Sequence, residues 1–364
     1  MVNKRNLARA SEQISLYWKC DKKRFYAFVA ALLLVLVVLP PGTYGKAPAL
    51  DNTWVDKTTT IAPPVRGNAP MVYDSRNRVV VLFGGGSFWT QYNNYLGDTW
   101  VYSVDTNTWT EMNPSPAPSS RTFHGLAYDS RAEVVVLFGG VHNTYEGALG
   151  DTWIYNVKTN TWTQMFPTDS PSPRAGTGLV YDSHHKKIVL HSLTPYPVYT
   201  AETWTYDLRA NTWTNMNPSN IPLWSSGDTC DPVNLTYDPK NDVSVNLCYF
   251  TVWTYSLTTN SWTKKPTPAV QPPARWGTDF AYDSRLDKMI LFGGCDWGAM
   301  RGDTWTYDVR TNAWSNLNPS VSPPGRCAHE LVYDSKNEVV VMFGGETWSA
   351  VLSETWIYYP PRKK

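Results

Sequence analysis

The sequence predicts an all-β fold, a closed propeller of six four-stranded blades, and three observations support this prediction. A unit with two regularly spaced tryptophans recurs with a period of about 51 residues, which is typical of propellers and solenoids. The last copy lacks its second tryptophan, whereas an isolated Trp54 precedes the first copy. The composition, with 18 Trp, 22 Tyr, 27 Pro and 23 Gly, suits short strands joined by many turns.

Each copy supplies four strands, a to d, in order. Strand a ends in a Tyr-Asp pair, strand b is apolar and usually ends in Gly-Gly, strand c contains Trp-x-Tyr, and strand d holds a second Trp nine residues after the first. The tyrosines of strand a are Tyr73, Tyr128, Tyr181, Tyr237, Tyr282 and Tyr333. The first tryptophans are Trp100, Trp153, Trp204, Trp253, Trp305 and Trp356, and the second ones are Trp109, Trp162, Trp213, Trp262 and Trp314. Asp and Asn after strands a and c favour tight hairpin turns there.

The position of Trp54, ahead of the first copy of the repeat, predicts how the ring closes. The strand that contains Trp54 is expected to complete the blade that contains Trp356, because that blade lacks its own strand d. Closure of this kind removes the exposed terminal edge that an open stack of blades would have.

The repeat resembles the kelch repeat. The resemblance rests on an apolar strand, Gly-Gly, and then a Tyr and a Trp with six residues between them, as in Tyr102 and Trp109. It covers residues 52–358 and implies a six-bladed propeller of the galactose-oxidase-like superfamily. Blades 3 and 4 depart from the pattern, because His191-Ser192 and Cys248-Tyr249 stand where Gly-Gly is expected.

The segment before the propeller is predicted to be an export signal. Residues 1–24 form a basic leader with seven Lys and Arg, residues 25–39 are apolar, and a linker follows over 40–51 before the propeller at 52–359 and a basic tail at 360–364. Fifteen helical residues span only about 22 Å, less than a bilayer core of about 30 Å. A cleaved signal peptide and an uncleaved membrane anchor both remain open. In either case the propeller is expected outside the cytoplasm.

One arginine and one acid recur in five of the six units, and blade 4 lacks both. We predict that they form a structural ion pair within each blade, since Arg binds carboxylates with a planar fork. An anion-binding ring of arginines is the alternative. The predicted pairs are Arg66 with Asp98, Arg121 with Asp151, Arg174 with Glu202, Arg275 with Asp303, and Arg326 with Glu354.

The b–c loops vary in length while the c–d hairpins do not, so one face of the ring is variable and suited to specific recognition. Aromatic residues that stand outside the repeat pattern gather in these loops and suit sugar rings or protein partners. The predicted ligand-binding residues are Trp89, Tyr92, Tyr95, Tyr145, Tyr199, Trp276, Trp297 and Trp348.

An exported context favours disulfides, and we expect Cys230 to pair with Cys248 and Cys295 with Cys327. No cofactor or metal site is predicted, because the Asp-Ser residues and His184-His185 lie in a–b turns on the opposite face. Nucleic acid is excluded as a partner, because beyond residue 24 the chain carries 25 bases against 29 acids.

The predicted function is therefore recognition of a protein or glycan at the cell envelope by the loop face. Two enzyme classes on similar scaffolds remain as alternatives. A sialic-acid-type epimerase would need acid and base groups, for which Glu146, Asp296, Arg301 and Glu346 are available. A copper-radical oxidase would need two His and two Tyr ligands, and His124 and His329 share one repeat position.

Overall fold

The computed structural model of the chain describes residues 50–87, 95–143, 147–193, 200–222, 235–249 and 251–362. The predicted basic leader and the apolar segment 25–39 lie outside these residues. No helix long and apolar enough to cross a membrane occurs in the described part of the chain.

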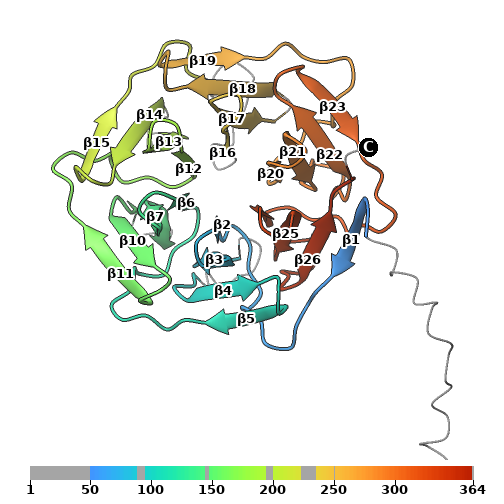
Figure 1. Cartoon of the computed structure of the whole chain (residues 1–364), viewed down its shortest axis with the longest axis horizontal. Coiled ribbons are helices and arrows are strands. Elements are labelled where there is room, and N and C mark those ends of the chain that lie inside the picture. Colours follow the sequence, from blue (N-terminus) through green and yellow to red (C-terminus); the bar gives the residue numbers. More distant parts are fainter. Residues whose placement is uncertain are drawn as a thin grey trace, which may run out of the picture. The chain divides into compact units, whose positions relative to one another are not determined.

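Six four-stranded antiparallel sheets follow one another around a ring (Figure 1), as predicted. Blade 1 contains β2 (Met71–Asp74), β3 (Val79–Phe83), β4 (Thr99–Ser103) and β5 (Thr108–Glu111). Blade 2 contains β6 (Gly125–Asp129), β7 (Val134–Phe138), β10 (Thr152–Asn156) and β11 (Thr161–Met165), with a short β8 (Val141–Asn143) and β9 (Gly147–Ala148) in its b–c loop. Blade 3 contains β12 (Thr177–Asp182), β13 (Lys187–Leu193), β14 (Ala201–Asp207) and β15 (Thr212–Asn215).

The other three blades repeat this plan. Blade 4 contains β16 (Leu235–Asp238), β17 (Val243–Cys248), β18 (Thr251–Ser256) and β19 (Ser261–Lys264). Blade 5 contains β20 (Asp279–Asp283), β21 (Lys288–Phe292), β22 (Thr304–Asp308) and β23 (Ala313–Asn316). Blade 6 contains β24 (Glu330–Asp334), β25 (Val339–Phe343) and β26 (Thr355–Tyr359), and its outer strand is β1 (Thr53–Asp56).

The predicted closure of the ring is confirmed. Strand β1 pairs antiparallel with β26, with Trp54 opposite Tyr358. The Tyr358 hydroxyl donates a hydrogen bond of 2.6 Å to Asn52 Oδ1. The same Tyr-to-Asn bond fixes the c–d hairpin of every other blade, as between Tyr102 and Asn107. The N-terminal strand thus completes blade 6 with the interactions that a continuous hairpin would make.

The two recurrent turns form as their side chains predict. In the a–b turn of blade 1 the Asp74 carboxylate accepts backbone N–H bonds of 2.9 Å from Arg76 and Asn77. In the c–d turns the asparagine takes a positive φ, as at Asn107 with 51°. Asn tolerates this left-handed conformation better than most residues.

The core lies between neighbouring blades, where the second tryptophan of one blade packs against strands of the preceding blade. Trp162 of blade 2 lies in one buried cluster with Val81 and Phe83 of blade 1. Its indole Nε1 donates a 3.0 Å hydrogen bond to Thr99 Oγ1 at the start of β4. The corresponding tryptophans of four further blades donate to the corresponding threonines: Trp213 to Thr152, Trp262 to Thr203, Trp54 to Thr304, and Trp109 to Thr355.

Candidate functional site

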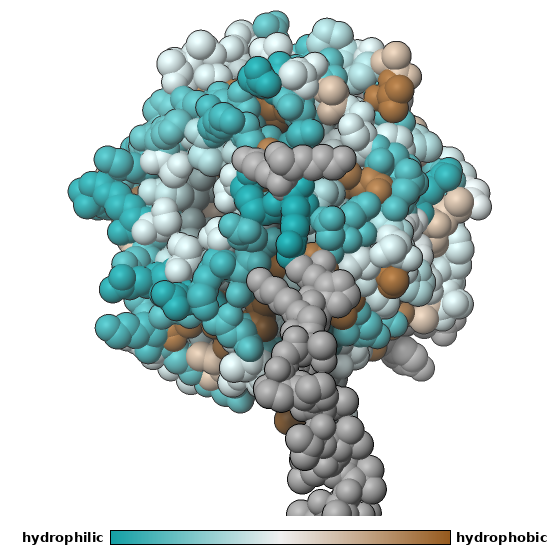
Figure 2. Space-filling model, turned by 45° about the vertical axis from the view of Figure 1, so that its right-hand side comes forward, coloured by the Kyte–Doolittle hydropathy of each residue, from teal (hydrophilic) through white to brown (hydrophobic). Residues whose placement is uncertain are grey.

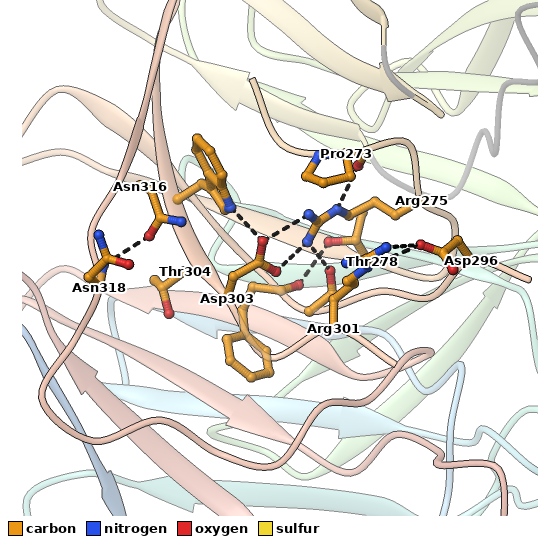
Figure 3. Close-up of polar contacts among 12 residues, drawn as sticks. Pro273, Arg275, Thr278, Asp296, Arg301, Asp303, Thr304, Asn316 and Asn318 are labelled. Atoms are coloured by element: carbon orange, nitrogen blue, oxygen red, sulfur yellow. Dashed lines mark hydrogen bonds and ion pairs between the residues drawn. The ribbon is translucent and has the colours of Figure 1, made fainter. Parts of the chain in front are cut away.

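The predicted arginine–carboxylate pairs form in all five blades that carry them. Arg275 Nη1 and Nη2 bind the two oxygens of Asp303 at 2.5 and 2.9 Å, Nη1 also donates to the Gly293 carbonyl at 2.9 Å, and Nε donates to the Pro273 carbonyl at 3.0 Å (Figure 3). The side chain of Arg275 is only 1% exposed. A guanidinium that is buried and makes four hydrogen bonds is a structural anchor, so the alternative of a ring of arginines open to anions is not supported.

The aspartates of three of these pairs, Asp98, Asp151 and Asp303, have lowered pKa values and stay ionised. Burial alone would raise the pKa of Asp303, but the hydrogen bonds and charge of Arg275 outweigh burial and lower the pKa. The same carboxylate also accepts a 2.7 Å hydrogen bond from the indole of Trp305, two residues ahead (Figure 3). This second role was not predicted from the sequence, although the acid stands two residues before the first Trp in all five copies.

The loop face carries a ladder of three aromatic rings across blades 4 and 5, formed by Tyr249, Trp276 and Trp297. Tyr249 lies in the b–c turn of blade 4, and its ring stacks on Trp276 at 6.2 Å with an interplanar angle of 7°. Trp276, in the d–a connection that enters blade 5, contacts Trp297 at 5.0 Å and 58°. Trp297 is 89% exposed. The structure thus brings two predicted ligand-binding residues together with Tyr249, whose role was not predicted because its only sequence signal is the departure from Gly-Gly.

Local hydrogen bonds hold Trp297 in place. Asp296 Oδ1 accepts N–H bonds of 2.8 Å from Gly298 and 2.9 Å from Ala299, which closes a tight turn with Trp297 at its tip. Asp296 Oδ2 forms an ion pair with Arg301 (Figure 3), and the resulting hydrogen bonds lower the pKa of Asp296. Because the backbone of this turn is already ordered, binding a partner through the indole does not carry the entropy cost of ordering the loop.

Trp348 occupies the equivalent place in blade 6. It follows Gly-Gly by three residues, as Trp297 does, and is 54% exposed. Thr347 braces its turn, since the hydroxyl oxygen accepts the Ala350 N–H at 3.0 Å. Adjacent blades therefore present a tryptophan on the same kind of turn.

Of the remaining predicted ligand-binding residues, the structure describes Tyr95 alone. Tyr95 is half-buried in the b–c loop of blade 1. Four others lie outside the described residues: Trp89, Tyr92, Tyr145 and Tyr199. On the face that Figure 2 shows, hydrophilic residues dominate and hydrophobic ones form small separate patches.

The inner strands of all six blades line a central cavity of about 390 Å³. Its wall includes Asp279 of β20 and Glu330 of β24, in adjacent blades. Asp279 Oδ2 accepts the backbone N–H of Leu331 at 2.6 Å. Burial raises the pKa of Asp279 to about 7.

The histidines weighed as oxidase ligands are buried in blade seams. The ring of His124 meets Phe83 edge-on at 5.5 Å, and His329 meets Phe292 in the same way at 5.4 Å. Burial lowers the pKa of both imidazoles to about 3, so they are neutral and act as packing groups. His191, which replaces the first Gly of blade 3, packs on Trp262 at 4.4 Å.

The predicted Cys295–Cys327 disulfide is wrong for this structure. Both cysteines are buried and free. Their thiols face each other across the seam of blades 5 and 6, where a hydrogen bond from Cys327 lowers the pKa of Cys295. The spacing of the two cysteines in the repeat correctly predicted that their sulfurs lie close together. It does not determine whether they are oxidised to a disulfide. Cys248 is buried, and its expected partner Cys230 lies outside the described residues, so that pairing stays a prediction.

Fold and site together define a closed kelch-type propeller whose rigid blades present exposed tryptophans on one loop face. Comparison with known proteins agrees with this class. Residues 50–231 and 242–364 match the KLHDC2/KLHL20/DRC7 Kelch-repeats domain, and the chain belongs to this family.

Curated relatives resemble the chain over a small part of their own length. Host cell factor 1 from Homo sapiens and from Rattus norvegicus is 28% identical over 256 residues, which is 63% of this chain and 12% of each relative. Multiple epidermal growth factor-like domains protein 8 from Mus musculus is 27% identical over 135 residues, which is 35% of this chain and 5% of the relative.

Proposed function

We propose that this kelch propeller is a protein-interaction module, and that its partner docks on the aromatic ladder of Tyr249, Trp276 and Trp297. The observation that carries the proposal is the exposure of Trp297, 89% of whose surface is open, on a turn braced by Asp296. Trp and Tyr dominate the binding energy of protein interfaces, where a few rigid aromatic residues supply most of the affinity.

The shape of the ladder favours a protein over a flat sugar ring. The Tyr249 and Trp276 rings are parallel within 7°, but Trp297 is tilted by 58° from Trp276. A sugar ring stacks on one flat aromatic face, whereas a tilted pair forms a ridge that an apolar pocket of a protein can enclose. Membership of the kelch-repeat family also supports a protein partner.

The test compares Trp297→Ala with Phe166→Ala in the full chain. Phe166 follows β11 in blade 2 and is 75% exposed, so it is a matched exposed aromatic residue away from the ladder. Proteins retained from the native source by the wild-type chain are identified, purified and titrated calorimetrically against all three chains. Loss of a central aromatic anchor costs about 2 kcal/mol or more, or roughly a 30-fold increase in Kd.

A partner that binds the wild type and Phe166→Ala alike, and Trp297→Ala at least about 30-fold more weakly, supports the proposal. Equal binding to all three chains contradicts the ladder as the docking surface. Binding of an envelope glycan that only Trp297→Ala loses would assign the same surface to carbohydrate recognition instead.

We also propose that the propeller acts outside the cytoplasm, at the cell envelope. The support is the sequence pattern of a basic leader followed by the apolar run 25–39. A reporter enzyme that is active only after export, fused after residue 364, should be active in the full chain and inactive when residues 1–39 are deleted. Activity of both fusions, or of neither, contradicts export by this segment.

A further inference from the structure

The a–b turn of blade 3 differs from the other a–b turns because it carries two adjacent histidines. His185 Nδ1 lies 2.8 Å from Asp182 Oδ2 and 3.7 Å from Asp242 Oδ1. Asp242 ends the corresponding turn of blade 4, and His184 Nδ1 lies 3.1 Å from its Oδ1. Two imidazoles and two carboxylates therefore meet at the seam between blades 3 and 4, on the face opposite the aromatic ladder.

The fold itself does not require histidine at either position. Where His185 stands, three other blades have an asparagine that donates to the turn aspartate: Asn77, Asn241 and Asn337. Where His184 stands, four other blades have a base paired with an acid of the next blade: Arg76 with Glu133, Lys240 with Asp287, Arg285 with Glu338, and Lys336 with Asp105. Blade 3 thus replaces an Asn and a base with two metal-ligand residues.

We propose that Asp182, His185, Asp242 and His184 form a binding site for a divalent transition metal such as Zn²⁺. Zinc bonds of about 2.0–2.2 Å to N and O place neighbouring ligand atoms of a tetrahedron roughly 3.3–3.5 Å apart. The observed separations of 2.8, 3.1 and 3.7 Å bracket this value. Ligand atoms of Asp182, His185 and Asp242 all lie within 4.8 Å of one another. His184 lies outside this group and is close to Asp242 alone, so its half-exposed side chain has to turn toward the other ligands to complete the tetrahedron.

The surroundings supply an outer shell for these ligands. If Nδ1 of His185 binds the metal, its Nε2–H can donate to Thr258 Oγ1 at 3.1 Å. The Thr258 hydroxyl donates in turn to Asp242 Oδ2 at 3.3 Å, and the Tyr237 hydroxyl donates to Asp242 Oδ1 at 2.8 Å. Ligating histidines commonly make such a bond through the second ring nitrogen, which fixes the ring orientation.

The site has the features of a structural metal site. Four protein ligands fill a tetrahedral zinc sphere and leave no position for a substrate. The two carboxylates neutralise the charge of the ion. Asp182 lies at the end of β12 in blade 3, His184 and His185 lie in the turn that follows it, and Asp242 lies in the corresponding turn of blade 4. The metal would therefore link blade 4, which has no arginine–carboxylate pair, to blade 3.

The test uses the full chain freed of metal by a chelator. Zn²⁺ is titrated calorimetrically, bound zinc is counted after desalting, and Tm is measured with and without zinc. The variant His184→Lys/His185→Asn rebuilds the turn as Asp-Ser-Lys-Asn, the sequence at residues 334–337 of blade 6, so it should fold normally. The control Lys336→His/Asn337→His adds the same two histidines to the turn of blade 6, where the next blade has Arg78 at the position equivalent to Asp242.

We expect one zinc per wild-type chain and a higher Tm with zinc than with chelator. The blade 3 variant should bind zinc at least about 100-fold more weakly and keep the wild-type Tm in chelator, and the blade 6 variant should gain no second zinc. A wild-type chain that binds no zinc, or a blade 3 variant that binds it as tightly as the wild type, would overturn the proposal.

Discussion

Blades 4 and 5 are neighbours with the same four strands, but only blade 5 has the arginine–carboxylate pair. The b–c loop of blade 5 runs over residues 293–303 between β21 and β22, whereas only residues 249–250 separate β17 from β18 in blade 4. Arg275 binds the Gly293 carbonyl at the start of the longer loop and the Asp303 carboxylate at its end. The pair is therefore a clamp on the base of a long loop, and blade 4 has no long loop to clamp.

The same contrast appears at the tryptophans of strand c. In blade 5 the indole of Trp305 donates to Asp303. In blade 4 Thr251 replaces the acid, and the buried Nε1 of Trp253 has no hydrogen-bond partner among the described residues. A blade can thus form without these polar contacts. Their purpose is to fix the loop face, which includes the turn that presents Trp297.

The largest effect should come from opening the clamp in blade 5. Arg275→Met leaves the Asp303 carboxylate without its partner in a site that is mostly buried, which costs about 3–5 kcal/mol of unfolding free energy. Adding Asp303→Thr to Arg275→Met makes blade 5 resemble blade 4. The double variant should lose less unfolding free energy than the sum of the losses in the two single variants. Urea unfolding of the four chains measures the cycle.

Hydrogen exchange of residues 294–302 shows whether the clamp acts on the loop. Exchange there should accelerate in Arg275→Met, while the c–d hairpin of blade 5 should keep its protection. Strict additivity of the two substitutions, or uniform acceleration over the whole blade, would contradict a local clamp.

A smaller loss should follow from removing the hydroxyl that joins blade 5 to blade 6. Thr304 Oγ1 accepts the indole N–H of Trp54 at 2.9 Å in a buried seam. Thr304→Val keeps the shape but leaves this donor unpaired, which costs about 1–3 kcal/mol. Thermal and urea unfolding measure the loss, and Thr306→Val on the same strand controls for the loss of a buried threonine hydroxyl.

Blade 4 supplies the reverse experiment, because Val252 occupies the position of Thr304 and lies in one cluster with Trp314. Val252→Thr should give the Trp314 indole an acceptor and raise the unfolding free energy by about 0.5–1 kcal/mol. Loss of stability in this variant would show that the seam of blades 4 and 5 is packed for a methyl group.

The repeat explains why the fold could be predicted. Six copies of the same spacing define strands and turns together, and Trp54 alone located the closure. The clamp could also be predicted, because its two members are absent from the same blade. The Trp–Thr seam bonds could not, because Thr is common in strands and the partner lies in another blade. The stack of Tyr249 on Trp276 likewise depends on how two blades sit side by side.

The smallest expected effect concerns Asp279, which lies on the inner strand of blade 5 in the wall of the central cavity. It allows the buried acid on the inner side of this blade to be compared with the arginine-paired Asp303 at its loop. Unlike Asp303, Asp279 has no arginine partner among the described residues, and burial raises its pKa to about 7 from an ordinary value of 3.8. The folded state therefore holds a proton that the unfolded chain releases above about pH 4. Its contribution to stability is full below pH 3.8 and declines as the pH rises through 7.

Asp279→Asn removes this decline, so the Tm of the variant should rise relative to wild type between pH 4.5 and 7.5 and then stay level. Replacing the carboxylate oxygen that faces the Leu331 N–H also lowers the Tm of the variant by an amount that does not change with pH. The test therefore depends on how the Tm difference between variant and wild type changes with pH, and not on whether that difference is positive or negative. Asp169→Asn, at an exposed position, controls for the loss of one negative charge. A constant difference across this range would mean that Asp279 is ionised and that the channel carries a fixed negative charge at blade 5.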